Sequence, residues 1–112
     1  MFALVCKNLL FQSQASAAAR AANAPMKTFL SCEAAAKQGA GIRVALVDLS
    51  STPEASAIAA LRAACPTAKI VCFGPHVDAE AMQAAVAAGA DAAIPNSRFN
   101  ASLDGLLALA SA

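Results

Sequence analysis

Arg43-Val44-Ala45-Leu46-Val47-Asp48-Leu49-Ser50-Ser51-Thr52-Pro53 is the stretch that decides the fold of this chain. Its apolar run is short, β-branched and uncharged, which predicts a central strand of a parallel sheet that is covered on both faces. Asp48 then lies at the carboxyl end of that strand, the edge where binding sites form in open α/β sheets. Thr52 and Pro53 predict the N-cap and first residue of a helix, with Glu54 near the positive end of the helix dipole.

Four more strand–helix pairs surround this unit. Strands are predicted at residues 2–6, 26–31, 43–48, 69–73 and 91–94. Helices are predicted at 9–22, 33–38, 53–65 and 78–89, and a final helix carrying Leu103, Leu106, Leu107 and Ala110 follows a loop at 95–99. The stripes Met82/Val86 and Leu106/Leu107 are expected to face the core. Regular βα alternation predicts one flavodoxin-like three-layer α/β domain spanning 1–112, with a five-stranded parallel sheet of order 2-1-3-4-5 and five helices.

Composition excludes several classes of protein. The chain has 112 residues, 59% of them hydrophobic, and alanine forms much of that share, so the core is expected to be thin. Its net charge is +1, and its eight basic residues are scattered along the sequence rather than clustered, which argues against a nucleic-acid surface. No apolar run approaches the ~18 residues of a membrane span.

The four cysteines, Cys6, Cys32, Cys65 and Cys72, show no metal-ligand spacing, and the chain has one histidine. Buried free thiols in a reducing compartment are the simplest interpretation. Lys7 and Asn8 interrupt the apolar residues at the N-terminus, and no basic residue precedes them, which argues against a secretory signal peptide. The sequence therefore predicts a cytoplasmic protein with no membrane segment.

Three motifs carry a resemblance to a known family. Val47-Asp48-Leu49 is followed closely by a proline, Ala88-Gly89-Ala90-Asp91 precedes the last predicted strand, and Phe99 leads into the last helix. With the predicted fold, these motifs make nearly the whole chain similar to a bacterial response-regulator receiver (CheY-like) domain. The resemblance implies that Asp48 occupies the phosphoacceptor position.

The remaining positions of a receiver active site differ. Receivers hold Mg²⁺ with adjacent carboxylates after strand 1, bind the phosphoryl group with Thr or Ser after strand 4, and carry Lys and an aromatic residue on strand 5. The residues at these positions here are Cys6 and Lys7, then Gly74, then Asn96 or Ser97, and Ala93. Phosphoryl transfer to a carboxylate needs a cation held by several oxygen ligands, which one carboxylate beside a lysine cannot supply. The chain therefore resembles a degenerate receiver, a pseudo-receiver.

Each candidate residue also has another interpretation. Asp48 can be a structural carboxylate, and Lys7 is then its expected ion-pair partner, because strands 1 and 3 are predicted neighbours. Cys6, Cys32, Asp48 and His76 include zinc-type ligands and could lie along one sheet edge. Gly74-Pro75-His76 could be a ligand loop or a simple strand-to-helix turn. Asn96-Ser97-Arg98 could bind an anion or form a solvated loop.

These observations predict a non-catalytic protein-interaction module of bacterial signal transduction, without cofactor or metal and not switched by aspartyl phosphorylation. Partners, or a second copy, are expected to bind the surface of helix 4, strand 5 and helix 5, which receivers use for that purpose. Neither nucleic acid nor membrane is expected as a partner. The alternatives are a receiver still phosphorylated on Asp48 and a small α/β enzyme or ligand binder. The latter would use Cys6, Lys7, Asp48 and His76.

Overall fold

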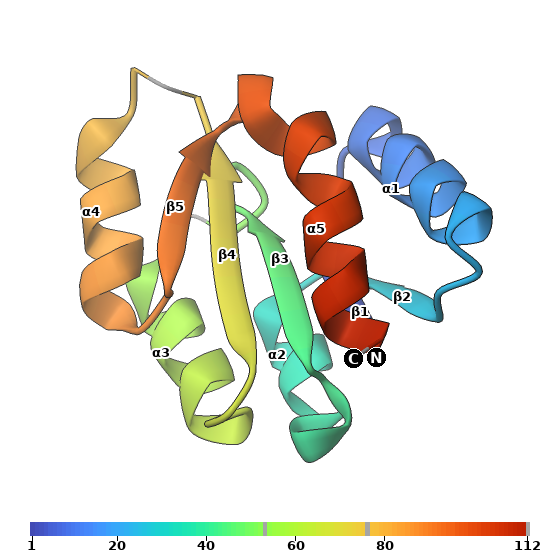
Figure 1. The fold of residues 1–112 in the computed structure, drawn as a ribbon. Coiled ribbons are helices and arrows are strands. Elements are labelled where there is room, and N and C mark those ends of the chain that lie inside the picture. Colours follow the sequence, from blue (N-terminus) through green and yellow to red (C-terminus); the bar gives the residue numbers. More distant parts are fainter. Residues whose placement is uncertain (53, 76, 112) are drawn as a thin grey trace.

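The computed structural model describes residues 1–52, 54–75 and 77–111, and its centre is a parallel sheet (Figure 1). The strands are β1 (Phe2–Val5), β2 (Met26–Phe29), β3 (Val44–Asp48), β4 (Lys69–Gly74) and β5 (Ala92–Pro95). Their order is β2-β1-β3-β4-β5, and every neighbouring pair is parallel. The predicted flavodoxin-like fold is confirmed.

Within the described residues, five α-helices cover the two faces of the sheet (Figure 1). They are α1 (Leu9–Ala21), α2 (Cys32–Ala36), α3 (Ala55–Ala64), α4 (Ala79–Ala88) and α5 (Phe99–Ser111), with short 3-10 turns at Gly39–Gly41 and Asn96–Arg98. In β1, Phe2 and Leu4 belong to the core under α1 and α5, whereas Ala3 and Val5 belong to the core under α2, α3 and α4. Strand side chains alternate between faces, so a strand buried on both faces must be apolar throughout.

The start of α3 differs from the prediction. The helix begins at Ala55, and its N-cap is Glu54, whose side chain makes no capping hydrogen bond. Thr52, the expected cap, is 6% exposed, and its Oγ1 lies 3.8 Å from the Sγ of Cys32. Its hydroxyl is therefore directed toward α2 rather than to the first turn of α3. Pro53 lies outside the described residues.

The start of α5 also differs, because the predicted loop at 95–99 is ordered as the end of β5, a 3-10 turn and the first helical residue, Phe99. The Phe99 ring lies 4.7 Å from that of Phe11 and 4.6 Å from that of Phe73, measured between centroids. Aromatic pairs at such distances add about 1 kcal/mol each beyond burial. This contact between α1, β4 and α5 holds the chain in helix earlier than local sequence indicates.

One predicted core stripe is correct and the other is wrong. Leu106 and Leu107 of α5 are buried, as expected. On α4, Val86 is 46% exposed and Met82 is half-buried, and Ala85 is the buried residue. The reason is that α4 packs mainly against α3 and the edge strand β5. Only a narrow face of this helix is therefore covered. None of the described helices is long and apolar enough to cross a membrane.

Arg62, in the last turn of α3, joins this helix to the loop that follows it and to the connection between α4 and β5, at the end of the molecule where the strands start. Its guanidinium donates to the backbone oxygens of Gly89 (2.9 Å) and Ala68 (2.7 Å) and, at 3.3 Å each, to those of Cys65 and Pro66. It also forms an ion pair of 2.7 Å with Asp91. A planar fork with five N–H donors suits such multiple acceptors. We call this arrangement the Arg62 clasp.

The Gly89-Ala90-Asp91 motif is explained by this clasp. Gly89 has a φ of +127°, and a Cβ on it would lie 3.0 Å from the Cβ and Cγ of Arg62. Both the backbone conformation and the close approach favour glycine there. The Asp91 carboxylate, besides pairing with Arg62, accepts a 2.8 Å hydrogen bond from the backbone N–H of Ile70. The motif therefore fixes where α4 ends and β5 begins.

The Asp91 carboxylate predicts acid sensitivity. The Ile70 N–H first, and then the Arg62 guanidinium, lower the pKa of this carboxyl below its ordinary value. A lowered folded-state pKa contributes stability that is present above the unfolded pKa of about 4 and is lost as pH falls through the folded pKa. In urea denaturation, the stability difference between wild type and Asp91→Asn should therefore shrink as pH is lowered from about 5 to 2. A pH-independent difference would contradict this assignment.

Candidate functional site

Asp48 lies at the carboxyl end of β3, and its carboxylate is enclosed by its own loop. It is 3% exposed. The backbone N–H of Ser50 donates to Oδ1 at 3.0 Å, and the Ser51 hydroxyl donates to Oδ2 at 2.9 Å. The backbone oxygen of Asp48 also accepts from the N–H groups of Ser51 and Thr52, at 3.1 and 3.0 Å. In this pattern an Asp side chain accepts from the backbone N–H two residues further along the chain and so stabilises a turn.

Cys6, which follows β1, is the second side chain in contact with this carboxylate. Its Sγ lies 3.4 Å from Asp48 Oδ2, and the residue is fully buried. Burial, with the neighbouring Asp48 charge adding to it, raises the pKa of the Cys6 thiol to about 11. The group therefore stays protonated at neutral pH and acts as a weak donor, and it is a poor nucleophile.

Lys7 does not pair with Asp48, so this expectation was wrong. The side chain of Lys7 is exposed, and among residues 1–52, 54–75 and 77–111 the ion pair found is that of Arg62 with Asp91. Successive residues of an extended chain point to opposite sides. Because Cys6 points into the core with α1 and α5, Lys7 points away from it. Its backbone N–H instead donates to the Ser51 hydroxyl at 2.9 Å.

Ser51 is therefore a residue of this site that the sequence analysis missed. It donates to Asp48, accepts from Lys7 and so links the chain after β1 to the loop after β3. The signal was present in Asp48-Leu49-Ser50-Ser51, since Asp followed by Ser two and three positions later is typical of a side-chain-stabilised turn.

The same sheet edge carries three other predicted residues of the described part of the chain, Gly74, Asn96 and Ser97, and none of these three forms a hydrogen bond with Asp48. Gly74 ends β4, opposite Pro95 of β5, and a Cβ on it would lie 3.4 Å from the Leu49 Cβ. Asn96 and Ser97 form the 3-10 turn after β5. The Oδ1 of Asn96 is buried and has no hydrogen-bond partner among the described residues, whereas Ser97 is exposed. His76 lies outside the described residues.

The donor set does not fit a divalent cation. In the described part of the chain, no three His, Cys, Asp or Glu side chains are grouped so that they could hold a metal ion. Cys6 belongs to the core on one face of the sheet and Cys32 to the core on the other, so these two thiols cannot share a metal. Mg²⁺ requires several oxygen ligands in octahedral geometry, and Asp48 offers one carboxylate whose two oxygens already accept hydrogen bonds.

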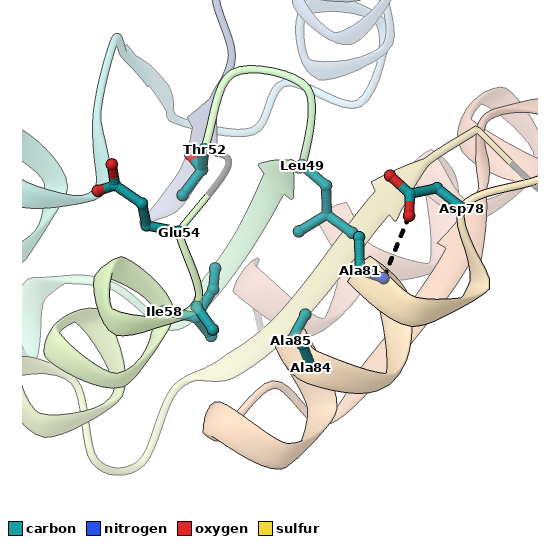
Figure 2. Close-up of a pocket in the computed structure, with 9 residues that line it drawn as sticks. Leu49, Thr52, Glu54, Ile58, Asp78, Ala81, Ala84 and Ala85 are labelled. Carbon is teal, nitrogen blue, oxygen red and sulfur yellow. Dashed lines mark hydrogen bonds between the residues drawn. The ribbon is translucent and has the colours of Figure 1, made fainter.

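A small hollow lies beside this edge, between the N-terminal ends of α3 and α4 (Figure 2). Its volume is about 220 Å³, and its lining includes Leu49, Ile58 and Ala85. Figure 2 shows Glu54 and Asp78 on opposite sides of it, with Asp78 capping α4 by accepting from the Ala81 N–H at 3.2 Å. Because alanine side chains form much of its wall, the hollow carries few groups for chemistry.

A scan against protein families and a search of curated proteins find no match to this chain. Solved structures do match. A response regulator from Burkholderia pseudomallei, solved with a phosphorylated aspartic acid, calcium ion and citrate, has a TM-score of 0.78 and 22% identity. The match covers 95% of this chain and 65% of that one, so this chain spans less than two thirds of that protein. A response regulator from Thermotoga maritima matches with a TM-score of 0.76 and 18% identity, over 99% of this chain and 97% of that one.

A third solved structure is described as a putative pilus assembly protein, CpaE2, from Sinorhizobium meliloti. It matches with a TM-score of 0.65 and 16% identity, over 91% of this chain and 95% of that one. At these identities the likeness concerns the fold, and the fold of this chain is that of response-regulator receiver domains.

Proposed function

We propose that this chain is a receiver-fold protein-interaction module that is not switched by Mg²⁺-dependent phosphorylation of an aspartate. The observation that carries the proposal is the state of Asp48, whose buried carboxylate is satisfied on both oxygens by Ser50, Ser51 and Cys6. A phosphoacceptor must instead present an oxygen to the incoming phosphorus atom, in line with the leaving group. Asp48 is better suited to hold the β3–α3 loop in one conformation.

The electrostatics support the same proposal. Phosphoryl transfer concentrates negative charge that a cation and fixed donors must neutralise. The positions that supply these groups in receivers hold Cys6, Gly74 and Asn96 here, and none of these side chains carries a positive charge or a carboxylate. Lys7 is charged, but its side chain is exposed and makes no ion pair with Asp48 among the described residues. The negative charge of a phosphoryl group on Asp48 would therefore not be neutralised by these residues.

The surface of α4 and β5 is the proposed contact for a partner. A shallow apolar depression of about 450 Å³ lies there, lined by Met82, Val86 and Ala93 together with Gln83 and Ala87. Val86, an aliphatic side chain of α4, is 46% exposed. A partner that covers this surface would remove apolar area from water at roughly 25 cal/mol per Å².

Bacterial signal transduction in the cytoplasm is the setting that we propose. The four cysteines are free thiols, which suits a reducing compartment. The fold is shared with response regulators and with a chain described as a putative pilus assembly protein. The latter favours, as a second form of the proposal, an interaction role within a larger bacterial assembly.

Phosphorylation tests the proposal directly. The protein is incubated with acetyl phosphate and Mg²⁺, and its intact mass is measured. We expect no stoichiometric addition of phosphate, because the cation ligands and charge-compensating groups are missing. A gain of one phosphate that Asp48→Asn abolishes would support a receiver still phosphorylated on Asp48 and would refute the proposal.

Titration with Mg²⁺ is an independent test. We expect no saturable shift of the thermal midpoint up to about 10 mM, because one hydrogen-bonded carboxylate cannot replace several waters of this ion. The matched control is Asp48→Asn, whose thermal midpoint should respond to Mg²⁺ as that of the wild type does. Saturable stabilisation of the wild type alone would show that Asp48 binds the ion.

A further inference from the structure

The charged side chains are spread along the sequence, but the fold gathers them at opposite ends of the molecule. Parallel strands all start at one end, and the helices that return between them finish there (Figure 1). Six of the eight basic residues lie at this end: Arg20, Lys27, Lys37, Arg43, Arg62 and Lys69. Among the described residues, Asp91 is the acidic residue at this end, and its charge is neutralised by the ion pair with Arg62. We call this surface the basic end.

The opposite end, where the strands finish, is acidic. Glu33 and Glu80 lie in the first turns of α2 and α4, and Glu54 and Asp78 are the N-caps of α3 and α4. Buried Asp48 lies beneath them at the end of β3. The basic residues here are Lys7, just after β1, and Arg98, just before α5. We call this surface the acidic end.

Helix dipoles account for part of this separation, but not for all of it. Acidic residues are favourable at helix N-termini and basic residues at C-termini, which explains Glu80 and Arg20. Lys27 and Lys69 belong to strands and have no helix dipole to stabilise. Both are exposed at the same end as Lys37, the C-cap of α2. The basic end therefore carries more positive charge than helix stability requires.

We propose that copies of this chain associate head to tail, with the basic end of one copy against the acidic end of the next. The two ends carry opposite charges. A second copy of this chain therefore supplies a complementary surface for each end. All five phenylalanines belong to the two internal cores or pack against them, so the basic end offers no aromatic ring to stack on nucleic-acid bases. Because the two contacting surfaces differ, the contact leaves one free end of each kind and allows open chains to grow.

This association depends on exposed charges and goes beyond the proposed function, since it does not involve Asp48 chemistry. Exposed charges are screened within about 8 Å at physiological salt, so the contact should be weak and sensitive to salt. Sedimentation velocity tests it over a range of protein concentrations. At about 50 mM salt the average sedimentation coefficient should rise with concentration, and at about 500 mM salt it should stay at the monomer value.

Two double variants make the test specific. Lys27→Glu/Lys69→Glu reverses the charge of two exposed side chains at the basic end, and Glu33→Lys/Glu80→Lys does the same at the acidic end. Each variant alone should remain monomeric at low salt. An equimolar mixture should associate again, because the unaltered acidic end of one variant can meet the unaltered basic end of the other, and the two altered ends carry opposite charges at the substituted positions. Circular dichroism confirms that both variants are folded.

The matched control is Asp104→Lys, within α5 and away from the two ends, which should leave the association of the wild type unchanged. A wild type that stays monomeric at low salt would overturn the proposal, and so would two reversed variants that fail to combine. Low-salt binding to anionic vesicles or to duplex DNA, lost in Lys27→Glu/Lys69→Glu while the wild type stays monomeric, would assign the basic end to a membrane or to nucleic acid instead.

Discussion

Asp48→Ala is expected to lower the free energy of unfolding by about 3 kcal/mol, measured by urea denaturation at neutral pH. The substitution removes the acceptor of three donors: the Ser50 N–H, the Ser51 hydroxyl and the Cys6 thiol. Hydrogen bonds to charged groups contribute about 1.5–3 kcal/mol, and donors left buried without an acceptor add a desolvation cost. Such a loss would identify Asp48 as a structural residue.

Two variants separate the parts of this effect. Asp48→Asn keeps an oxygen for the Ser50 N–H but presents an amide to the donors at Oδ2, so a loss of about half that of Asp48→Ala is expected. Ser51→Ala leaves the Ser50 and Cys6 contacts in place and should cost about 1 kcal/mol. If Asp48→Ala lowers stability by less than about 1 kcal/mol, the loop does not depend on the carboxylate and the structural role assigned to it is wrong.

Arg62→Met is expected to cost about 3 kcal/mol by the same measurement. It keeps much of the aliphatic stem, so the loss reports the guanidinium contacts to Gly89, Ala68 and Asp91 rather than packing. The Arg62 side chain is 24% exposed, which makes its hydrogen bonds less screened than those of a surface arginine. Removing the donor also leaves partly buried carbonyl oxygens without their partner.

The matched controls are a conservative change and a distant one. Arg62→Lys keeps the charge but cannot form the planar fork, so most of the loss should remain. Arg20→Met, in the exposed last turn of α1, should change stability by less than about 0.5 kcal/mol. Equal stability of Arg62→Lys and wild type would show that the charge alone matters, and the clasp would then be an ordinary ion pair.

Much of the fold could be predicted because its signals are local. The apolar run ending in Asp48 marks β3, and glycine and proline residues mark the ends of most helices. Regular alternation of strands and helices then leaves few sheet orders. The start of α5 was missed because it depends on rings far apart in the sequence, Phe11, Phe73 and Phe99, which no local pattern relates.

The candidate site could be predicted in position but not in detail. That Cys6 and Asp48 meet follows from the neighbouring strands β1 and β3. Whether Cys6 or Lys7 faces Asp48 depends on how side chains alternate along the strand. A shift of one residue in the predicted strand boundary exchanges the two, so the sequence could not exclude the contact with Lys7. The separation of charge between the two ends was likewise invisible, because basic residues scattered in the sequence converge only when parallel strands bring their starting residues together.

The contact between Cys6 and Asp48 constrains how this chain could evolve. A Cys6→Asp change would place a second carboxylate where the thiol now lies, 3.4 Å from Asp48 Oδ2. Two carboxylates so close cannot both ionise without a cation between them, and Asp48 would lose the Cys6 thiol as a donor. The intermediate would therefore be less stable before it gained a cation site. Gaining such a site requires several substitutions at once, which makes it difficult to reach by single steps.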